Sequence, residues 1–171
     1  ERLNDRPTDN LAAYNAYLRG RQLMSRRNSA DMDQAAVEFQ RAVELDPEFA
    51  LAWVGVAETA SLQSQYSDLG LAEAMERQKT ATERALAIDD RLGEAHLGLA
   101  EFHAFHQRNS EAEAAFRKAI ELSPGYASAY HWYSNFLAEF PHRLSESLEV
   151  AQKAQELDPL ASIIQLSLAS K

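Results

Sequence analysis

Three histidines carry the side chains best suited to metal chemistry in this sequence. His96, His103 and His106 are spaced so that an α-helix would place them roughly on one face. A catalytic zinc helix uses the pattern His-Glu-x-x-His, whereas Ala104 and Phe105 separate His103 from His106 here. We therefore expect packed or surface histidines, and we predict no metal site.

The other residue types that support catalysis form no motif in this chain. Its glycines do not make a phosphate-binding loop, and there is no nucleophile elbow. Aspartate and glutamate are plentiful, but they fall on the outer faces of predicted helices, where solvent exposure is their ordinary role. We predict no catalytic residue, no cofactor and no enzymatic activity.

Composition and charge narrow the classes of partner. The 171 residues are 46% hydrophobic and carry a formal net charge of −9, which argues against binding nucleic-acid phosphates or an anionic membrane. The absence of cysteine excludes disulfides and thiolate metal sites. No apolar run approaches the ~20 residues that span a bilayer. A cytoplasmic location is favoured, and a periplasmic one stays open for a membrane-anchored parent.

One short sequence motif recurs along the chain: it consists of small and apolar residues followed by Asp-Pro or Ser-Pro. The proline ends a helix, because its ring disfavours helical geometry at the preceding residue. The period is close to the 34 residues typical of helix–turn–helix repeats, although the second unit is longer. The motif occupies residues 42–47, 119–124 and 154–159, and a degenerate copy without proline occupies residues 85–90.

These copies predict an array of helix pairs behind a short linker. We assign residues 1–8 to the linker and 9–171 to the array. The chain lacks an initiator methionine and stops part-way along a predicted helix, so we expect a piece cut from a longer array. Apolar residues between Ile163 and Leu168 would then offer a surface for self-association. The expected repeats are about 10–47, 48–90, 91–124, 125–159 and a partial fifth at 160–171.

Helical spacing of apolar residues predicts the helices themselves. The first should run from Leu11 to about Arg27, with Thr8, Asp9 or Asn10 as its N-cap. In the third repeat, residues 110–113 form a capping-box sequence that should start the second helix. Further helices are expected to end at 46, to span 52–66 and to span 71–88.

These positions resemble the tetratricopeptide repeat over nearly the whole chain. The family pattern places aromatic and small residues in the first helix of each pair, and Ala, Phe or Tyr, and Ala in the second, before a proline. The resemblance implies an all-α, right-handed superhelix whose stacked helix pairs bury a continuous core. Matching residues include Trp53 and Ala57; His96, Ala100, His103, Ala112, Phe116 and Pro124; and Tyr130, Tyr133, Ser134 and Pro159.

The same resemblance implies a concave groove lined by the first helices, which would bind a protein or peptide. The lining is apolar and acidic, so it suits a partner with apolar and basic residues. The alternative is a plain spacer whose residues there are merely exposed. The predicted partner-binding residues are Leu51, Val54, Glu58, Leu97, Glu101, Phe105, His131 and Asn135, together with Trp132, which lies off the repeat pattern.

Two narrower comparisons refine this prediction. Repeats that clamp the carboxylate of a chaperone tail use Lys, Arg and Asn in the groove, whereas Glu58 and Glu101 here would repel it. The stretch Ala13–Arg21, the long second repeat and Asp158–Ser162 resemble the arrays of bacterial signalling proteins with an adenylyl-cyclase or winged-helix domain. A regulatory or sensory arm of such a protein is therefore the alternative function.

Overall fold

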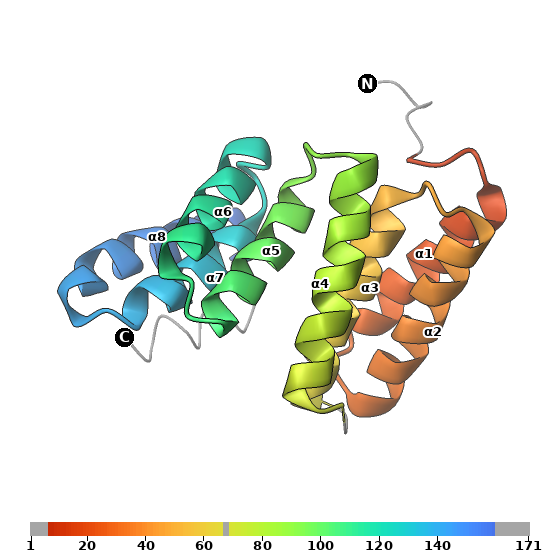
Figure 1. The fold of residues 1–171 in the computed structure, drawn as a ribbon, viewed down its shortest axis with the longest axis horizontal. Helices are drawn as coiled ribbons and strands as arrows, with labels where there is room; N and C mark the ends of the chain where they lie inside the picture. The colour runs from red at the N-terminus through yellow and green to blue at the C-terminus, as the bar shows by residue number, and fades with distance from the viewer. Residues whose placement is uncertain (1–6, 67–68, 160–171) are drawn as a thin grey trace. The chain divides into compact units, whose positions relative to one another are not determined.

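The computed structural model describes residues 7–66 and 69–159. Within these ranges the chain forms eight α-helices and one short 3-10 turn, without any strand (Figure 1). Consecutive helices pack on each other in four pairs. The elements are α1 (Leu11–Met24), α2 (Ser29–Leu45), α3 (Ala50–Tyr66), α4 (Leu71–Ile88), α5 (Gly93–Phe105), α6 (Asn109–Leu122), α7 (Ala127–Ala138), η1 (Pro141–Arg143) and α8 (Leu144–Leu157).

The helix boundaries agree closely with those predicted from the sequence. α3 ends at Tyr66, and α4 runs from Leu71 to Ile88, as expected. α1 ends at Met24 rather than near Arg27, because Arg27 has a left-handed backbone with φ 49°, a conformation that ends a helix. The predicted fifth repeat and its apolar surface lie outside the described residues.

Asparagine side chains start the first two helices. Asn10, one of the three predicted caps, accepts a hydrogen bond from the Ala13 amide at 3.1 Å, and Asn28 accepts one from the Asp31 amide at 3.0 Å. Asn10 also donates from Nδ2 to the carbonyl of Leu45 at 2.7 Å. This bond joins the beginning of α1 to the end of α2, so the first helix pair is closed at that end.

The capping box predicted for the start of α6 is wrong. The helix begins at Asn109, and its N-cap residue is Arg108, which makes no side-chain capping bond. In a capping box, the Glu113 carboxylate would accept a hydrogen bond from the backbone amide of the N-cap residue. Instead it accepts two hydrogen bonds from Arg143, at 2.8 Å each. A charge-assisted, bidentate bond to a guanidinium is stronger than one to a neutral backbone amide.

The described residues divide into two compact units, the first ending at Arg91 and the second beginning at Leu92. In the first unit, Phe39 of α2 is fully buried. Its ring lies so close to α1 and α3 that a Cβ atom on Gly20 would come within 2.9 Å of it, and one on Gly55 would come closer still. Tyr17 of α1 also packs on Phe39, with ring centroids 5.8 Å apart. Phe39 therefore holds α2 against both first helices of the unit.

The second unit has its aromatic core at the equivalent place. Phe116 of α6 is buried, and its ring lies 5.4 Å from those of Tyr133 and Phe136 on α7. The core positions predicted for Phe116 and Tyr133 are confirmed. The small residues expected to allow close approach of helices are buried as well, namely Ala57, Ala100 and Ser134.

The contact between Phe39 and Gly55 leads to a stability prediction. Alanine at position 55 would place a methyl group within the volume of the buried Phe39 ring. We expect G55A to lose about 2 kcal/mol of unfolding free energy, because overpacking outweighs the gain of about 1 kcal/mol from better helix propensity. Urea denaturation followed by circular dichroism measures the loss.

The matched control is G125A. A Cβ atom on Gly125 would meet nothing within 4 Å, so this variant should unfold like the wild type. A G55A protein as stable as the wild type would contradict the packing described for Phe39.

Candidate functional site

The predicted partner-binding residues of the first unit lie on α3, where they share one face. The first helices of the pairs are α1 and α3 in the first unit and α5 and α7 in the second. We use the name first-helix face for the side of these helices that carries the predicted residues. Val54 is buried, whereas Leu51 is half-buried against the core. Glu58 is half-buried and accepts a hydrogen bond from Arg21 of α1 at 2.7 Å. The charge of Glu58 is thus balanced within the unit.

In the second unit, the predicted residues of α5 change from buried to exposed along the helix. Leu97 belongs to the aromatic core, Glu101 one turn later is half-buried, and Phe105 at the end of the helix is 41% exposed. The ring of Phe105 meets that of His106 edge-on, with centroids 5.1 Å apart. Glu101 and Phe105 are therefore the accessible part of this helix.

The predicted residues of α7 are less accessible. His131 is buried, and its Nε2 lies 3.2 Å from the side-chain nitrogen of Asn135, which is half-buried. Trp132 is also half-buried: it packs against the core of the second unit, and its ring lies 5.3 Å from that of His131. Three of the predicted residues consequently lie in the cores: Val54, Leu97 and His131. The accessible ones are Leu51 and Glu58 in the first unit, and Glu101, Phe105, Trp132 and Asn135 in the second.

Two of the three spaced histidines, His103 and His106, contact aromatic rings. The ring of His106 lies 4.4 Å from that of Phe102, and the ring of His103 lies 5.9 Å from the same ring. Burial, and then the nearby charge of Arg108, lower the pKa of His103, so this side chain favours its neutral form. In the part of the chain that the structure describes, no three His, Asp or Glu side chains are grouped closely enough to hold a metal ion.

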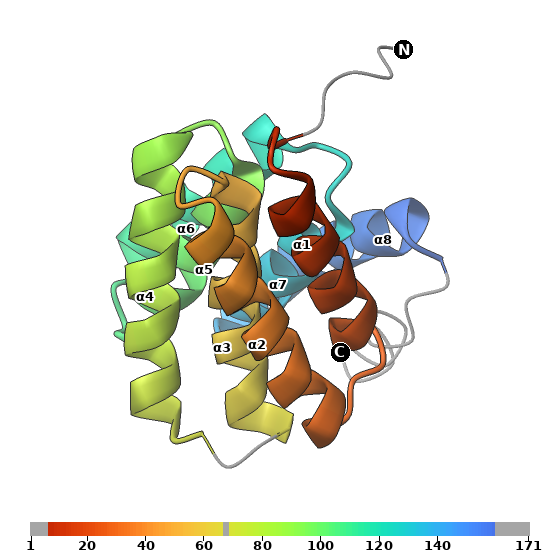
Figure 2. The ribbon, with the colours of Figure 1, turned by 90° about the vertical axis from the view of Figure 1, so that its right-hand side faces the viewer.

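The first unit also contains a groove that the sequence did not reveal. It has a volume of about 1190 Å³ and is lined by residues of α2, α3 and α4. Figure 2 shows these three helices. We call it the second-helix groove, because α2 and α4 are the second helices of their pairs. The one sequence feature that points toward this groove is Val37, an apolar residue on the outer side of α2. In the structure the Val37 side chain is 58% exposed. None of the predicted partner-binding residues lines it.

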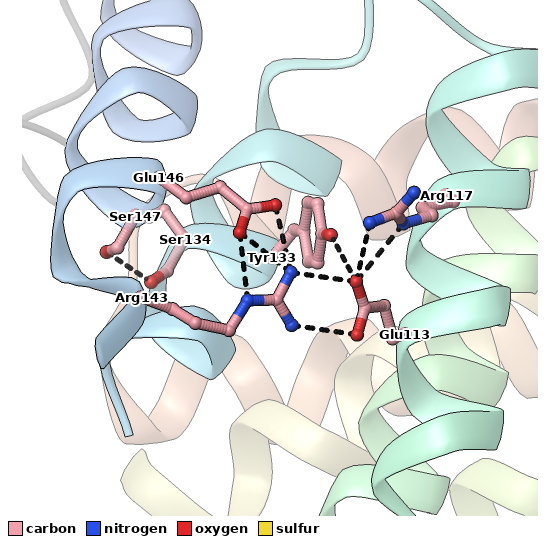
Figure 3. Close-up of polar contacts among 7 residues, drawn as sticks. All are labelled: Glu113, Arg117, Tyr133, Ser134, Arg143, Glu146 and Ser147. Carbon is pink, nitrogen blue, oxygen red and sulfur yellow. Dashed lines mark hydrogen bonds and ion pairs between the residues drawn. The ribbon is translucent and has the colours of Figure 1, made fainter. Parts of the chain in front are cut away.

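A network of polar and charged side chains joins four elements of the second unit, namely α6, α7, η1 and α8 (Figure 3). Glu113 of α6 accepts hydrogen bonds from Arg143 at the end of η1, from Arg117 at 2.7 Å and from the Tyr133 hydroxyl at 3.1 Å. Arg143 also donates to Glu146 at 2.8 Å. The hydrogen bonds from Arg143 are the main cause that lowers the pKa of Glu113 to about 2, despite an opposing effect of burial. The network fixes the start of α8 against α6.

A buried hydroxyl pair supports the same junction. Ser147 of α8 donates from its hydroxyl to the backbone carbonyl of Ser134 at 2.7 Å, and both side chains are fully buried (Figure 3). The Ser134 hydroxyl donates to the carbonyl of His131 at 2.7 Å. Because both residues are small, α7 and α8 can approach closely while their polar atoms stay bonded.

The low pKa of Glu113 predicts how acid affects stability. The group ionises near pH 4.5 in the unfolded chain and near pH 2 in the folded one, so its contribution is complete above about pH 5 and is lost as the pH falls toward 2. We expect E113Q to cost about 2 kcal/mol at pH 7, and to cost much less near pH 2. Urea denaturation at several pH values measures both.

The matched control is E156Q, which removes an exposed carboxylate that accepts a hydrogen bond from Lys153 on the same helix, α8. We expect its stability to follow that of the wild type at each pH. The role of the network is refuted if E113Q and E156Q give the same curve.

Comparisons with known proteins agree with the helix-pair architecture. The sequence profile of the tetratricopeptide repeat family matches residues 93–126, which contain α5 and α6. Functionally curated proteins gave no match. The helices in the described ranges also fail to reach the length and apolar character needed to cross a membrane.

Solved structures extend the likeness to most of the chain. TTC0263, a tetratricopeptide repeat protein of Thermus thermophilus, is similar with a TM-score of 0.63 at 17% identity, over 93% of this chain and 98% of that one. PilF of Pseudomonas aeruginosa gives 0.65 at 20% identity, over 93% and 67%. MamA gives 0.54 at 19% identity, over 88% and 81%. The predicted all-α repeat solenoid is thereby confirmed, and the profile match identifies residues 93–126 as a tetratricopeptide repeat.

Proposed function

We propose that this chain is a non-catalytic protein-interaction module that binds a peptide or helix of its partner on the first-helix face. The repeat family and the structurally similar proteins support an interaction scaffold. The observation that carries the binding mode is Phe105, a large aromatic side chain that is 41% exposed at the end of α5. Aromatic anchors of this kind dominate the binding energy of many interfaces.

The neighbours of Phe105 indicate what the partner contains. Glu101 lies one turn earlier on α5, and Asn135 is on α7, which packs beside α5. An apolar side chain of the partner would contact Phe105, a Lys or Arg would pair with Glu101, and the Asn135 amide would bind the partner's backbone. In the first unit, Glu58 already pairs with Arg21 at 2.7 Å.

A peptide library displayed on phage tests this binding mode, because it samples many candidate partner sequences at once. We expect the selected peptides to combine apolar and basic residues. Their affinity, measured by fluorescence polarisation, should fall at least tenfold for F105A, because loss of a buried aromatic contact costs more than about 1.4 kcal/mol.

L148A is the matched control for that experiment. Leu148 is an apolar residue of α8 with similar exposure, 37%, and it is not one of the predicted partner-binding residues. Peptides that bind F105A and the wild type equally well would refute the first-helix face as the binding surface. A library that returns no binder would refute the proposal as a whole.

A further inference from the structure

The second-helix groove is open, elongated and apolar at its base. Val56 and Ala60 of α3 form the floor, Val37 lies on the α2 wall and Ala81 lies on the α4 wall. Trp53 also lines the groove; its indole N–H donates to the carbonyl of Pro47 at 2.9 Å, so the ring has a fixed position. Of these residues, Val37 is exposed and Trp53 and Val56 are half-buried, whereas Ala60 and Ala81 are buried. Apolar side chains left partly open to solvent in a groove favour the docking of another apolar surface.

This groove is separate from the first-helix face. Its floor residues Trp53, Val56 and Ala60 recur at helical spacing along α3. The predicted residues of the first-helix face on α3 (Leu51 and Glu58) follow the same spacing but are offset by two positions. A two-residue step turns an α-helix by about 200°, so the two sets point to opposite sides of α3. A partner on one side therefore leaves the other side accessible.

The charges on the groove are predominantly negative. Asp33, Glu44, Glu73 and Glu76 line it, against two arginines, Arg41 and Arg77. One of these arginines, Arg77, is already engaged by Glu73 at 2.6 Å. Carboxylates therefore outnumber guanidinium groups on the walls, and this acidic excess complements a basic partner.

The dimensions of the groove fit one helix. The lining residues of α2 extend from Asp33 to Glu44, which corresponds to about 17 Å along the helix axis, or roughly three turns. Its volume of about 1190 Å³ exceeds the range of about 300–1,000 Å³ usual for small-molecule pockets. A helix laid between α2 and α4 would place apolar residues spaced by three and four positions on Val37, Val56 and Ala60.

We propose that the second-helix groove binds an amphipathic α-helix of a partner protein, with apolar residues on the side that faces α3 and Lys or Arg residues along its flanks. The apolar face covers Val37 and the floor of α3. The basic flanks pair with the carboxylates on the rim, chiefly Glu76. The interaction is independent of peptide binding at the first-helix face, so either site can fail without the other.

A designed peptide tests the groove directly. The probe is an amidated helical peptide of about 14 residues, which spans about 21 Å, with leucines on one face and lysines on the other. The W132F variant leaves Trp53 as the sole tryptophan, since the chain has two, and its fluorescence reports occupancy of the groove. We expect saturable binding with a dissociation constant in the micromolar range and a blue shift of the Trp53 emission.

The decisive variants are V37K and L148K, each in the W132F background. Both replace an exposed apolar residue and change the net charge equally, but only Val37 lines the groove. Because Val37 is 58% exposed, V37K should retain the helical circular dichroism of its parent. We expect V37K to weaken peptide binding at least tenfold, whereas L148K should stay within twofold of the parent.

Two further comparisons separate apolar docking from general attraction between opposite charges. A peptide of identical composition, with its leucines spread around the helix, should bind at least tenfold more weakly. E76K should weaken binding of the probe more than E83K does, since Glu83 is on the same helix but does not line the groove. The proposal is overturned if the probe does not bind, if V37K and L148K weaken binding equally, or if the scrambled peptide binds as well as the probe.

Discussion

The fold depends on one steric constraint: a large ring on a second helix fills the space between two first helices. Phe39 of α2 lies against Gly20 of α1 and Gly55 of α3, and both glycines are needed because a Cβ atom at either position would meet the ring. Phe116 of α6 contacts Tyr133 and Phe136 of the following first helix in the same way. Within each unit, the first helix pair therefore completes its core with the first helix of the pair that follows, as in a repeat array.

This packing determines which surfaces remain for partners. Each first helix contacts its own second helix and a neighbouring first helix. Some residues that were predicted to bind a partner therefore lie in the cores, such as Val54 and Leu97. Of the predicted residues, Phe105 is the most exposed large apolar side chain. On the other side of α3, α2 and α4 stand apart over an apolar floor and leave a second groove. The chain thus has a second surface, separate from the first-helix face.

The sequence predicted features that depend on local spacing, and it failed where distant residues decide. The bounds of α4 follow from helical periodicity, and the burial of Phe116 and Tyr133 follows from their positions in the repeat pattern. The capping role of Glu113 was wrong because Arg143, 30 residues along the chain, binds that carboxylate. The second-helix groove was missed because three helices form it together, and Val37 alone does not indicate the other two helices.

The most direct test of the central constraint is a nuclear Overhauser measurement on the labelled chain. The packing predicts strong cross-peaks from the ring protons of Phe39 to the α-protons of both Gly20 and Gly55, with ring-current shifts of these glycine signals. Such contacts would show that one side chain touches two first helices at once. Cross-peaks to only one glycine, or to neither, would contradict this account of how the array is held together.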